Sequence, residues 1–132
     1  MLLVKTKIGP SKINGIGLFA DQFIPKGTRV WKFQPGFDLK IDKSDLAKLS
    51  EPAKAIFLKY AYLNPATKKY ILCFDDARFF NHSENANCLD FGSTDDEEEG
   101  DDIAARDIQK GEELTCNYKK FDADFNYKMS IN

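Results

Sequence analysis

Apolar and polar side chains alternate along the first quarter of the chain, a pattern typical of β-strands with one buried face. The alternation runs through residues 2–8 and again through residues 16–33. Pro25-Lys26-Gly27 divides the second run as a turn. This part of the chain therefore predicts a hairpin or a meander of strands.

The apolar period changes to that of a helix between Ser44 and Leu63. Residues recurring at helical spacing are Leu46, Ala47, Leu49, Ala53, Ile56, Phe57 and Tyr60. Pro52 interrupts the pattern, because proline removes a helical hydrogen bond. The segment therefore predicts one or two short helices.

Strand patterns return in the second half of the chain. Residues 69–74, 103–108 and 113–118 alternate or are apolar, and residues 89–93 favour a short extended segment. Between them lies an acidic run, residues 95–102. Like charges in a block usually stay in water, so a solvated hairpin tip is the simpler interpretation of this run, and steering of lysine-rich substrates is the alternative.

Length and composition limit the classes of protein to consider. A chain of 132 residues, 42% hydrophobic and 30% charged, suits one soluble globular domain, and eleven Phe with five Tyr predict an aromatic core. The formal charge of −2 offers no general attraction to nucleic acid or to anionic membranes. We find no signal-peptide pattern and no membrane-span pattern, and expect an intracellular protein, cytoplasmic or nuclear.

The three cysteines, Cys73, Cys88 and Cys116, are an odd number at wide spacing. This predicts free thiols in a reducing compartment rather than a disulfide framework. One histidine and three scattered cysteines lack the spacing of a zinc finger, so we expect no metal site.

The segment RFFNHSENANC, residues 78–88, is the most informative in the chain. It carries Asn81, His82 and Asn87 directly after an apolar run. Such groups are costly to bury without partners, so the segment is either a knot of internal hydrogen bonds or a ligand seat.

Two other features are weak when each is taken alone. Gly15-Ile16-Gly17 lets the backbone approach a ligand closely, but a glycine bulge that bends a strand is the simpler explanation when this feature is taken alone. A dinucleotide-binding fingerprint fails here, because it needs a third glycine opening a helix. Tyr118 at the end of a strand is most simply a packing residue.

Taken in order, NGIG, RFFNHSENANC and GEELTCNY resemble the SET domain of protein-lysine methyltransferases. The resemblance spans about residues 3–120 and leaves 121–132 as a tail that closes the active site, so residues 1–132 form a single SET domain. It is a minimal form, similar to small viral and bacterial members, without pre-SET or zinc-binding post-SET segments. The resemblance implies a mostly β fold of several small β-sheets with few short helices and a C-terminal pseudoknot.

The same resemblance implies S-adenosyl-L-methionine as cofactor and methyl transfer to a lysine amine of a protein substrate, a histone or another basic protein. Tyr118 corresponds to the catalytic tyrosine at the mouth of the lysine channel. The expected cofactor-binding residues are Gly15, Ile16, Gly17, Arg78, Asn81, His82, Phe121 and Phe125. The candidates for aromatic walls of the channel are Tyr118, Tyr60, Tyr62, Phe121, Phe125 and Tyr127.

The chemistry requires the lysine to lose its proton before it attacks the methyl group. We expect desolvation and the sulfonium charge to lower the lysine pKa, without a dedicated carboxylate base and without His82 as the base. Ala86 replaces a usual proline, and Cys88 lacks the cysteines that would complete a post-SET zinc site. The alternatives are a degenerate SET module that binds partners without catalysis and an unrelated binding domain; the protein is expected to be a monomer or a homodimer.

Overall fold

The computed structural model describes residues 1–91, 99–120 and 122–131. Most regular structure in this part of the chain is strand. The strands are β1 (Thr6–Pro10), β2 (Ile16–Ala20), β3 (Arg29–Lys32), β4 (Leu39–Ile41), β5 (Tyr62–Leu63), β6 (Tyr70–Leu72), β7 (Asn81–His82), β8 (Cys88–Phe91), β9 (Asp101–Ala104) and β10 (Glu113–Cys116). The helices are α1 (Glu51–Tyr60), α2 (Phe125–Ile131) and the 3₁₀-helices η1 (Lys43–Lys48), η2 (Asp76–Phe79) and η3 (Tyr118–Lys120). The predicted mostly β fold is confirmed.

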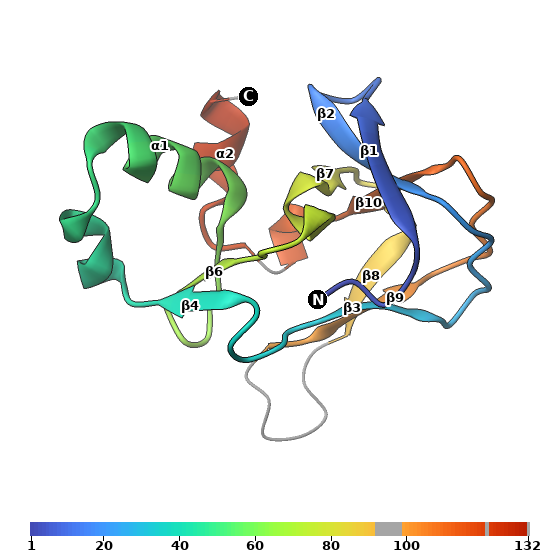
Figure 1. Cartoon of the computed structure of the whole chain (residues 1–132), viewed down its shortest axis with the longest axis horizontal. Helices are drawn as coiled ribbons and strands as arrows, with labels where there is room; N and C mark the ends of the chain where they lie inside the picture. Colours follow the sequence, from blue (N-terminus) through green and yellow to red (C-terminus); the bar gives the residue numbers. More distant parts are fainter. Residues whose placement is uncertain (92–98, 121, 132) are drawn as a thin grey trace.

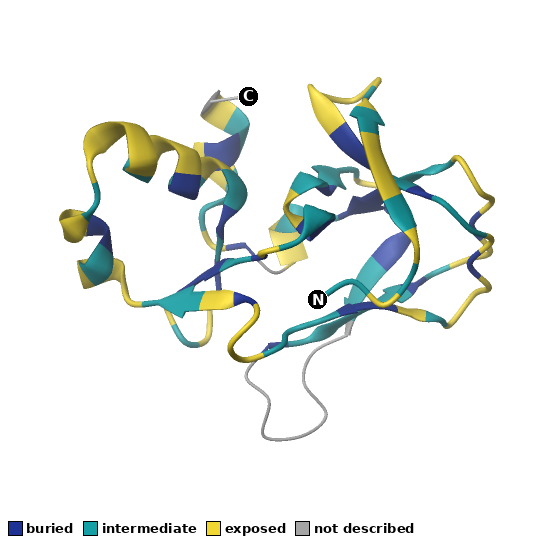
Figure 2. Cartoon of the chain, viewed as in Figure 1, coloured by how far each residue is buried: buried dark blue, intermediate teal, exposed yellow. Residues whose placement is uncertain are grey.

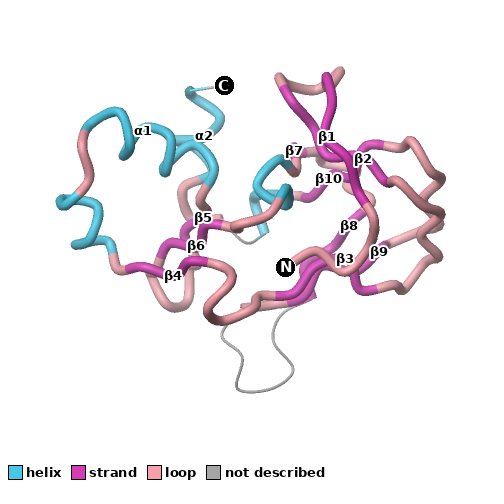
Figure 3. The backbone as a smooth tube through the Cα atoms, viewed as in Figure 1, coloured by secondary structure: helices cyan, strands magenta, loops and turns pink. Residues whose placement is uncertain are grey.

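The described strands form three small sheets (Figures 1 and 3). Their orders are β1-β2-β10-β7, β3-β9-β8 and β4-β6-β5. β1 and β2 form an antiparallel hairpin, but β2 and β3, on either side of the predicted turn at Pro25-Lys26-Gly27, lie in different sheets and do not pair. Helices α1 and α2 are neighbours at the end of the molecule away from the β1–β2 hairpin, whereas η2 lies next to β1 and β2 (Figure 1).

Strand β10 brings the C-terminal part of the chain into the middle of the first sheet. It pairs antiparallel with β2 and parallel with β7, where Thr115 lies opposite Asn81 and Cys116 opposite His82. The Asn87 side chain fastens the same region, because its Oδ1 accepts from Thr115 N–H at 2.9 Å and its Nδ2 donates to the Glu113 carbonyl at 2.8 Å. This is the pairing that the expected pseudoknot requires.

Helix α1 begins where the sequence allows a helix to begin. The Ser50 hydroxyl accepts from the Ala53 N–H at 3.4 Å, and Pro52 lies in the first turn, where its missing N–H costs nothing. The helix therefore begins next to Pro52, and the break that the sequence predicted lies between η1 and α1. Only Phe57 of α1 is buried, so most of the helix surface faces solvent (Figure 2).

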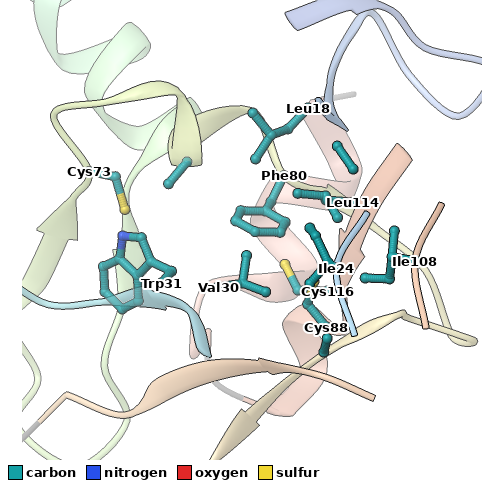
Figure 4. Close-up of a cluster of buried hydrophobic side chains, with 13 residues drawn as sticks. Leu18, Ile24, Val30, Trp31, Cys73, Phe80, Cys88, Ile108, Leu114 and Cys116 are labelled. Atoms are coloured by element: carbon teal, nitrogen blue, oxygen red, sulfur yellow. The ribbon is translucent and has the colours of Figure 1, made fainter. Parts of the chain in front are cut away.

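The main core is more aliphatic than the composition predicted. The largest fully buried side chains include Leu18, Ile24, Ile71, Ile108 and Leu114. Among the described residues, the buried members of the main cluster with aromatic rings are Trp31 and Phe80 (Figure 4). Short, closely packed strands favour branched aliphatic side chains at their centre, so many aromatic rings lie at the margins.

Other described aromatic side chains lie at the margins of the main cluster, and Phe57 and Tyr70 are buried in a second, smaller cluster. Phe37 and Phe74 are exposed and pack edge to face, with ring centroids 5.2 Å apart. The three cysteines are buried free thiols, as predicted. Within the described ranges, the helices are too short or too polar to cross a membrane.

The C-terminal end of the acidic run differs from the predicted hairpin tip. Residues 95–98 lie outside the described residues, but Asp101 and Asp102 begin β9, two residues earlier than the sequence pattern indicated. Glu99 is only 3% exposed. It is buried because its carboxylate has partners: Oε2 accepts from Tyr62 and Asn64 at 3.0 Å, and Oε1 lies 3.3 Å from Lys40 Nζ.

Candidate functional site

Asn81 joins two of the predicted motifs. Its Nδ2 lies within hydrogen-bond distance of the Asn14 carbonyl at 3.1 Å and the Ile16 carbonyl at 3.3 Å, on both sides of Gly15. It also lies 3.1 Å from Ser11 Oγ and 3.0 Å from Glu113 Oε1. The structure therefore brings the glycine hairpin and the NHS segment to one point, as the sequence predicted.

Glu113 is a member of this cluster that sequence reasoning missed. A Cβ at Gly17 would lie 2.0 Å from Glu113 Oε1, so the close approach of this carboxylate requires glycine there. Gly15 is required for a different reason: it has space around it but a φ of +49°. One indication of its role was present in the sequence: Glu113 begins the strand that ends shortly before Tyr118.

His82 fastens the C-terminal segment to the NHS segment. Its Nδ1 accepts from the Tyr118 N–H at 3.1 Å, and its Nε2 lies 3.7 Å from Glu84 Oε1. Its ring centroid is 5.6 Å from that of Tyr118 and 5.1 Å from that of Phe125 on α2. The imidazole is thus a packing and hydrogen-bonding element between two site residues.

The Tyr118 phenol points back to the NHS segment and donates to the Phe80 carbonyl. Burial, together with nearby Cys116, Asp122 and Cys73, raises the pKa of the Tyr118 phenol well above its usual value. The hydroxyl therefore stays protonated at neutral pH and can act as a hydrogen-bond donor.

A lysine of α2 covers the other side of Tyr118. Lys128 Nζ lies 5.1 Å from the Tyr118 ring centroid and 2.8 Å from Asp122 Oδ2. Both side chains of this ion pair are almost fully buried, and Asp122 Oδ1 also accepts from the Leu63 N–H at 3.0 Å. The pair ties the C-terminal helix to the site.

Arg78 and the two tail phenylalanines have different positions. Arg78 is exposed, and its guanidinium lies 5.1 Å from the Phe79 ring centroid rather than on Asn81. Phe125 is half-buried beside His82. Phe121 lies outside the described residues.

A pocket of about 180 Å³ opens beside Tyr118. Its aromatic lining comprises Trp31, Tyr60, Tyr62, Phe80 and Tyr118. Tyr60 and Tyr62 were among the candidates for a lysine channel, whereas Phe125 and the exposed Tyr127 do not line this pocket.

The same pocket contains acidic groups that sequence reasoning did not assign. Asp90 and Asp102 line it together with Glu99. Burial raises the pKa of Asp102 to about 7, with the negative charges of Asp90 and Asp101 adding to the effect. Burial also raises the pKa of Asp90. A pocket with aromatic walls and carboxyl groups is suited to an organic cation.

Metal binding has no counterpart in the described ranges. No cluster of three or more His, Cys, Asp or Glu side chains is arranged there to hold an ion.

Comparison with known proteins places this geometry in a family. A family model of the SET domain matches residues 15–119. No curated protein matches the chain.

Solved structures share the fold. A Plasmodium falciparum protein provisionally assigned as a histone methyltransferase is 20% identical with a TM-score of 0.61, covering 89% of this chain and 95% of that one. Polycomb Repressive Complex 2 of Chaetomium thermophilum is 20% identical with a TM-score of 0.70, over 97% of this chain but 17% of that chain. The same complex in an autoinhibited conformation bound to S-adenosylmethionine gives a TM-score of 0.67. At this identity the likeness concerns the fold.

Proposed function

The chain belongs to the SET-domain family, and on that premise we propose that it is a protein-lysine methyltransferase that uses S-adenosyl-L-methionine. The observation that carries the proposal is that Asn81 fastens the glycine hairpin, while His82, the next residue, holds Tyr118 at the edge of an aromatic, acidic pocket. We propose residues 3–120 as the functional core and the following tail as its cover.

The residues present fit this cofactor. Asn81 fixes the exposed backbone of the glycine hairpin, and His82 with Phe125 presents a ring surface beside it. The cofactor supplies a methyl group on a sulfonium cation, and aromatic faces with nearby carboxyl groups stabilise cations. Gly15, Ile16, Gly17, Asn81, His82 and Phe125 would hold it. Arg78 orders the start of the NHS segment, and Phe121 is proposed for the same cofactor site.

The main task of this chain in the reaction is orientation in a dry site. Tyr118 is the proposed catalytic residue: its protonated hydroxyl, anchored on the Phe80 carbonyl, sets one wall of the lysine pocket. Tyr60 and Tyr62 form further walls, and the Tyr62 hydroxyl is fixed by Glu99 at 3.0 Å. Rings held in this way keep water out and align the amine.

The proposed substrate is a lysine side chain of a basic protein, such as a histone. Acidic side chains at the pocket favour a positively charged partner. Solved structures of similar fold include a Polycomb complex with a histone H3 mark, which supports histones as the first substrates to test.

A degenerate module that binds without catalysis is the competing function. The intact Asn81 contacts and the buried, protonated Tyr118 favour catalysis, because a binding module needs neither.

The test uses the purified protein, S-adenosylmethionine with a labelled methyl group, and a mixture of histones and other basic proteins. We expect transfer of label, lost in Asn81→Ala through weaker cofactor binding and reduced in Tyr118→Phe with cofactor binding retained. Cofactor binding without transfer to any basic protein would favour the non-catalytic module. Transfer that neither substitution affects would refute the site assignment.

A further inference from the structure

Asp90 and Asp102 are directly opposite each other in the β8–β9 pair. Opposite residues of antiparallel strands project to the same face of a sheet. The next pair on that face is Cys88 and Ala104, which are 0% and 2% exposed. The two carboxyl groups therefore face the interior of the molecule, and both line the pocket beside Tyr118.

Neither carboxyl group has a partner that would explain its position. Among the described residues, no side-chain hydrogen bond or ion pair is formed by Asp90 or Asp102. Asp101, by contrast, pairs with Arg29. Two facing carboxyl groups next to a pocket of about 180 Å³ are unfavourable as two anions, so the pair either retains a proton or receives a cation in the pocket.

The other charged groups at the pocket are already engaged or lie at its rim. The charged lining residues are Arg78, Asp90, Glu99, Asp102, Lys120 and Lys128. Lys128 is paired with Asp122, Glu99 with Lys40, and Arg78 and Lys120 are exposed. The thiols and phenols that face the carboxyl pair are Cys73, Cys88, Cys116, Tyr62 and Tyr118. The ammonium of Met1 also acts on Asp102.

A second polar group of the same pocket, the indole N–H of Trp31, is buried without a hydrogen-bond partner in the described part of the chain. Trp31 is 4% exposed, lies opposite Asp102 in the β3–β9 pair, and lines the pocket. Its buried Nε1 has no hydrogen-bond partner. Figure 4 shows this nitrogen facing Cys73, which lines the same pocket. An indole N–H without an acceptor beside two carboxyl groups without a partner shows that the polar groups lining this pocket do not satisfy one another.

We propose that Asp90 and Asp102 form the seat of the target-lysine ammonium and accept the proton that this ammonium must lose before methyl transfer. The proposal rests on the proposed function and replaces the earlier expectation that no carboxylate serves as base. An ammonium seated between the two carboxylates and beside the Tyr118 ring brings a positive charge to carboxyl groups that have no cationic partner among the described residues.

The step balances within these groups. One N–H bond of the ammonium breaks, the proton forms an O–H bond on the carboxyl pair, and the nitrogen keeps the electron pair. That electron pair could then form the N–C bond to the methyl group that the bound sulfonium donor would supply, with the S–C bond breaking to leave a neutral thioether, and the carboxyl pair returns the proton to solvent. A base that titrates near the working pH is effective in this role.

The first arm of the test needs no methyl donor. The whole protein, labelled with ¹³C at the aspartate carboxyl groups, is titrated by NMR with n-butylammonium, a mimic of the lysine side chain. The Asp90 and Asp102 resonances are assigned by their loss in Asp90→Asn and Asp102→Asn. We expect both to titrate at higher pH than an ordinary aspartate, and to shift with n-butylammonium but not with n-butanol. Shifts no larger than those of Asp21 would overturn the seat.

The second arm measures the pH dependence of methyl transfer to a basic peptide. For the unaltered protein the rate should rise with pH and level off near neutrality. Asp102→Asn should lower the rate at pH 7 by about a hundredfold, with a rate that keeps rising toward the ordinary lysine pKa of about 10.4. Asp21→Asn, a surface carboxylate exchanged in the same way, should leave the profile unchanged. A profile for Asp102→Asn that is uniformly lower but parallel would show a structural role and overturn proton acceptance.

The two arms separate this inference from the function on which it rests. An NMR response without methyl transfer to any substrate would support the ammonium seat and contradict the methyltransferase function. Methyl transfer without an NMR response would support the function and overturn the seat.

Discussion

Replacing Asp102 by asparagine should stabilise this protein at alkaline pH. Asp102 has no partner among the described residues, and burial raises its pKa from 3.8 to about 7. Each pKa unit corresponds to about 1.4 kcal/mol, so a rise of about three units makes the ionised carboxylate cost up to about 4 kcal/mol of folding free energy. This figure is an upper limit, because the pocket admits solvent.

The sign follows from proton binding. An acid whose folded-state pKa is raised binds its proton more tightly in the folded state, so stability falls as pH rises from about 4 to about 7. Above pH 7 the cost is fully present, and below pH 4 it is absent. Asparagine resembles the protonated acid at every pH, and the substitution should therefore gain stability at pH 8 but little at pH 4.5.

The assay is urea unfolding of the unaltered protein, Asp102→Asn and the control Asp21→Asn at both pH values. Comparing variants at one pH cancels the other titrating groups. Equal stability changes at pH 4.5 and pH 8, or a loss of stability at pH 8, would refute the argument that Asp102 is buried without a partner.

Three further substitutions test the contacts that assemble the site. Gly17→Ala places a Cβ 2.0 Å from Glu113 Oε1, so it should displace Glu113, weaken binding of the methyl donor in calorimetry and lower the free energy of unfolding by about 1–3 kcal/mol. Gly9→Ala, where a Cβ would have ordinary contacts at 3.7 Å, is the control. An equal effect of both substitutions would contradict the account. Lys128→Met leaves the buried Asp122 carboxylate unpaired and should cost about 3–5 kcal/mol in thermal unfolding; Asp122→Asn in the same chain should recover most of this, and no recovery would argue against the ion pair. Asn87→Ala removes an acceptor for Thr115 N–H and a donor to Glu113 and should cost about 1–3 kcal/mol in urea unfolding, whereas a neutral result would mean that this link does not hold the C-terminal segment.

The sequence predicted the parts of the site that short motifs encode. Asn81, His82 and the glycine hairpin carry their chemistry within a few residues, and the structure brings them together with Tyr118. The strand that carries Ile16 and Gly17 was also predictable, because periodicity is a local property. The short strand β7, which carries Asn81 and His82, was expected to be a loop. The assignment of these residues to a cofactor stays a prediction.

The parts that were missed depend on contacts between distant segments. Glu113 matters because of Gly17 and Asn81, which lie far away in the sequence. Asp90 and Asp102 face each other because of the β8–β9 register, and a shift of one residue would abolish this arrangement. The sequence alone does not give this register, because the acidic run lies between the two strands. The core is aromatic only in part, with Trp31, Phe57, Tyr70 and Phe80 buried among the described residues, because composition does not say which rings lie at the margin.

The central claim is that this SET-domain protein methylates lysine through Tyr118. The most direct measurement is accurate-mass analysis of a basic protein, such as a histone, after incubation with this protein and S-adenosylmethionine, with Tyr118→Phe in parallel. The account predicts methylated lysine in the first sample and much less in the second, at equal cofactor binding. Absence of methyl-lysine in both samples, or equal amounts in both, would contradict it.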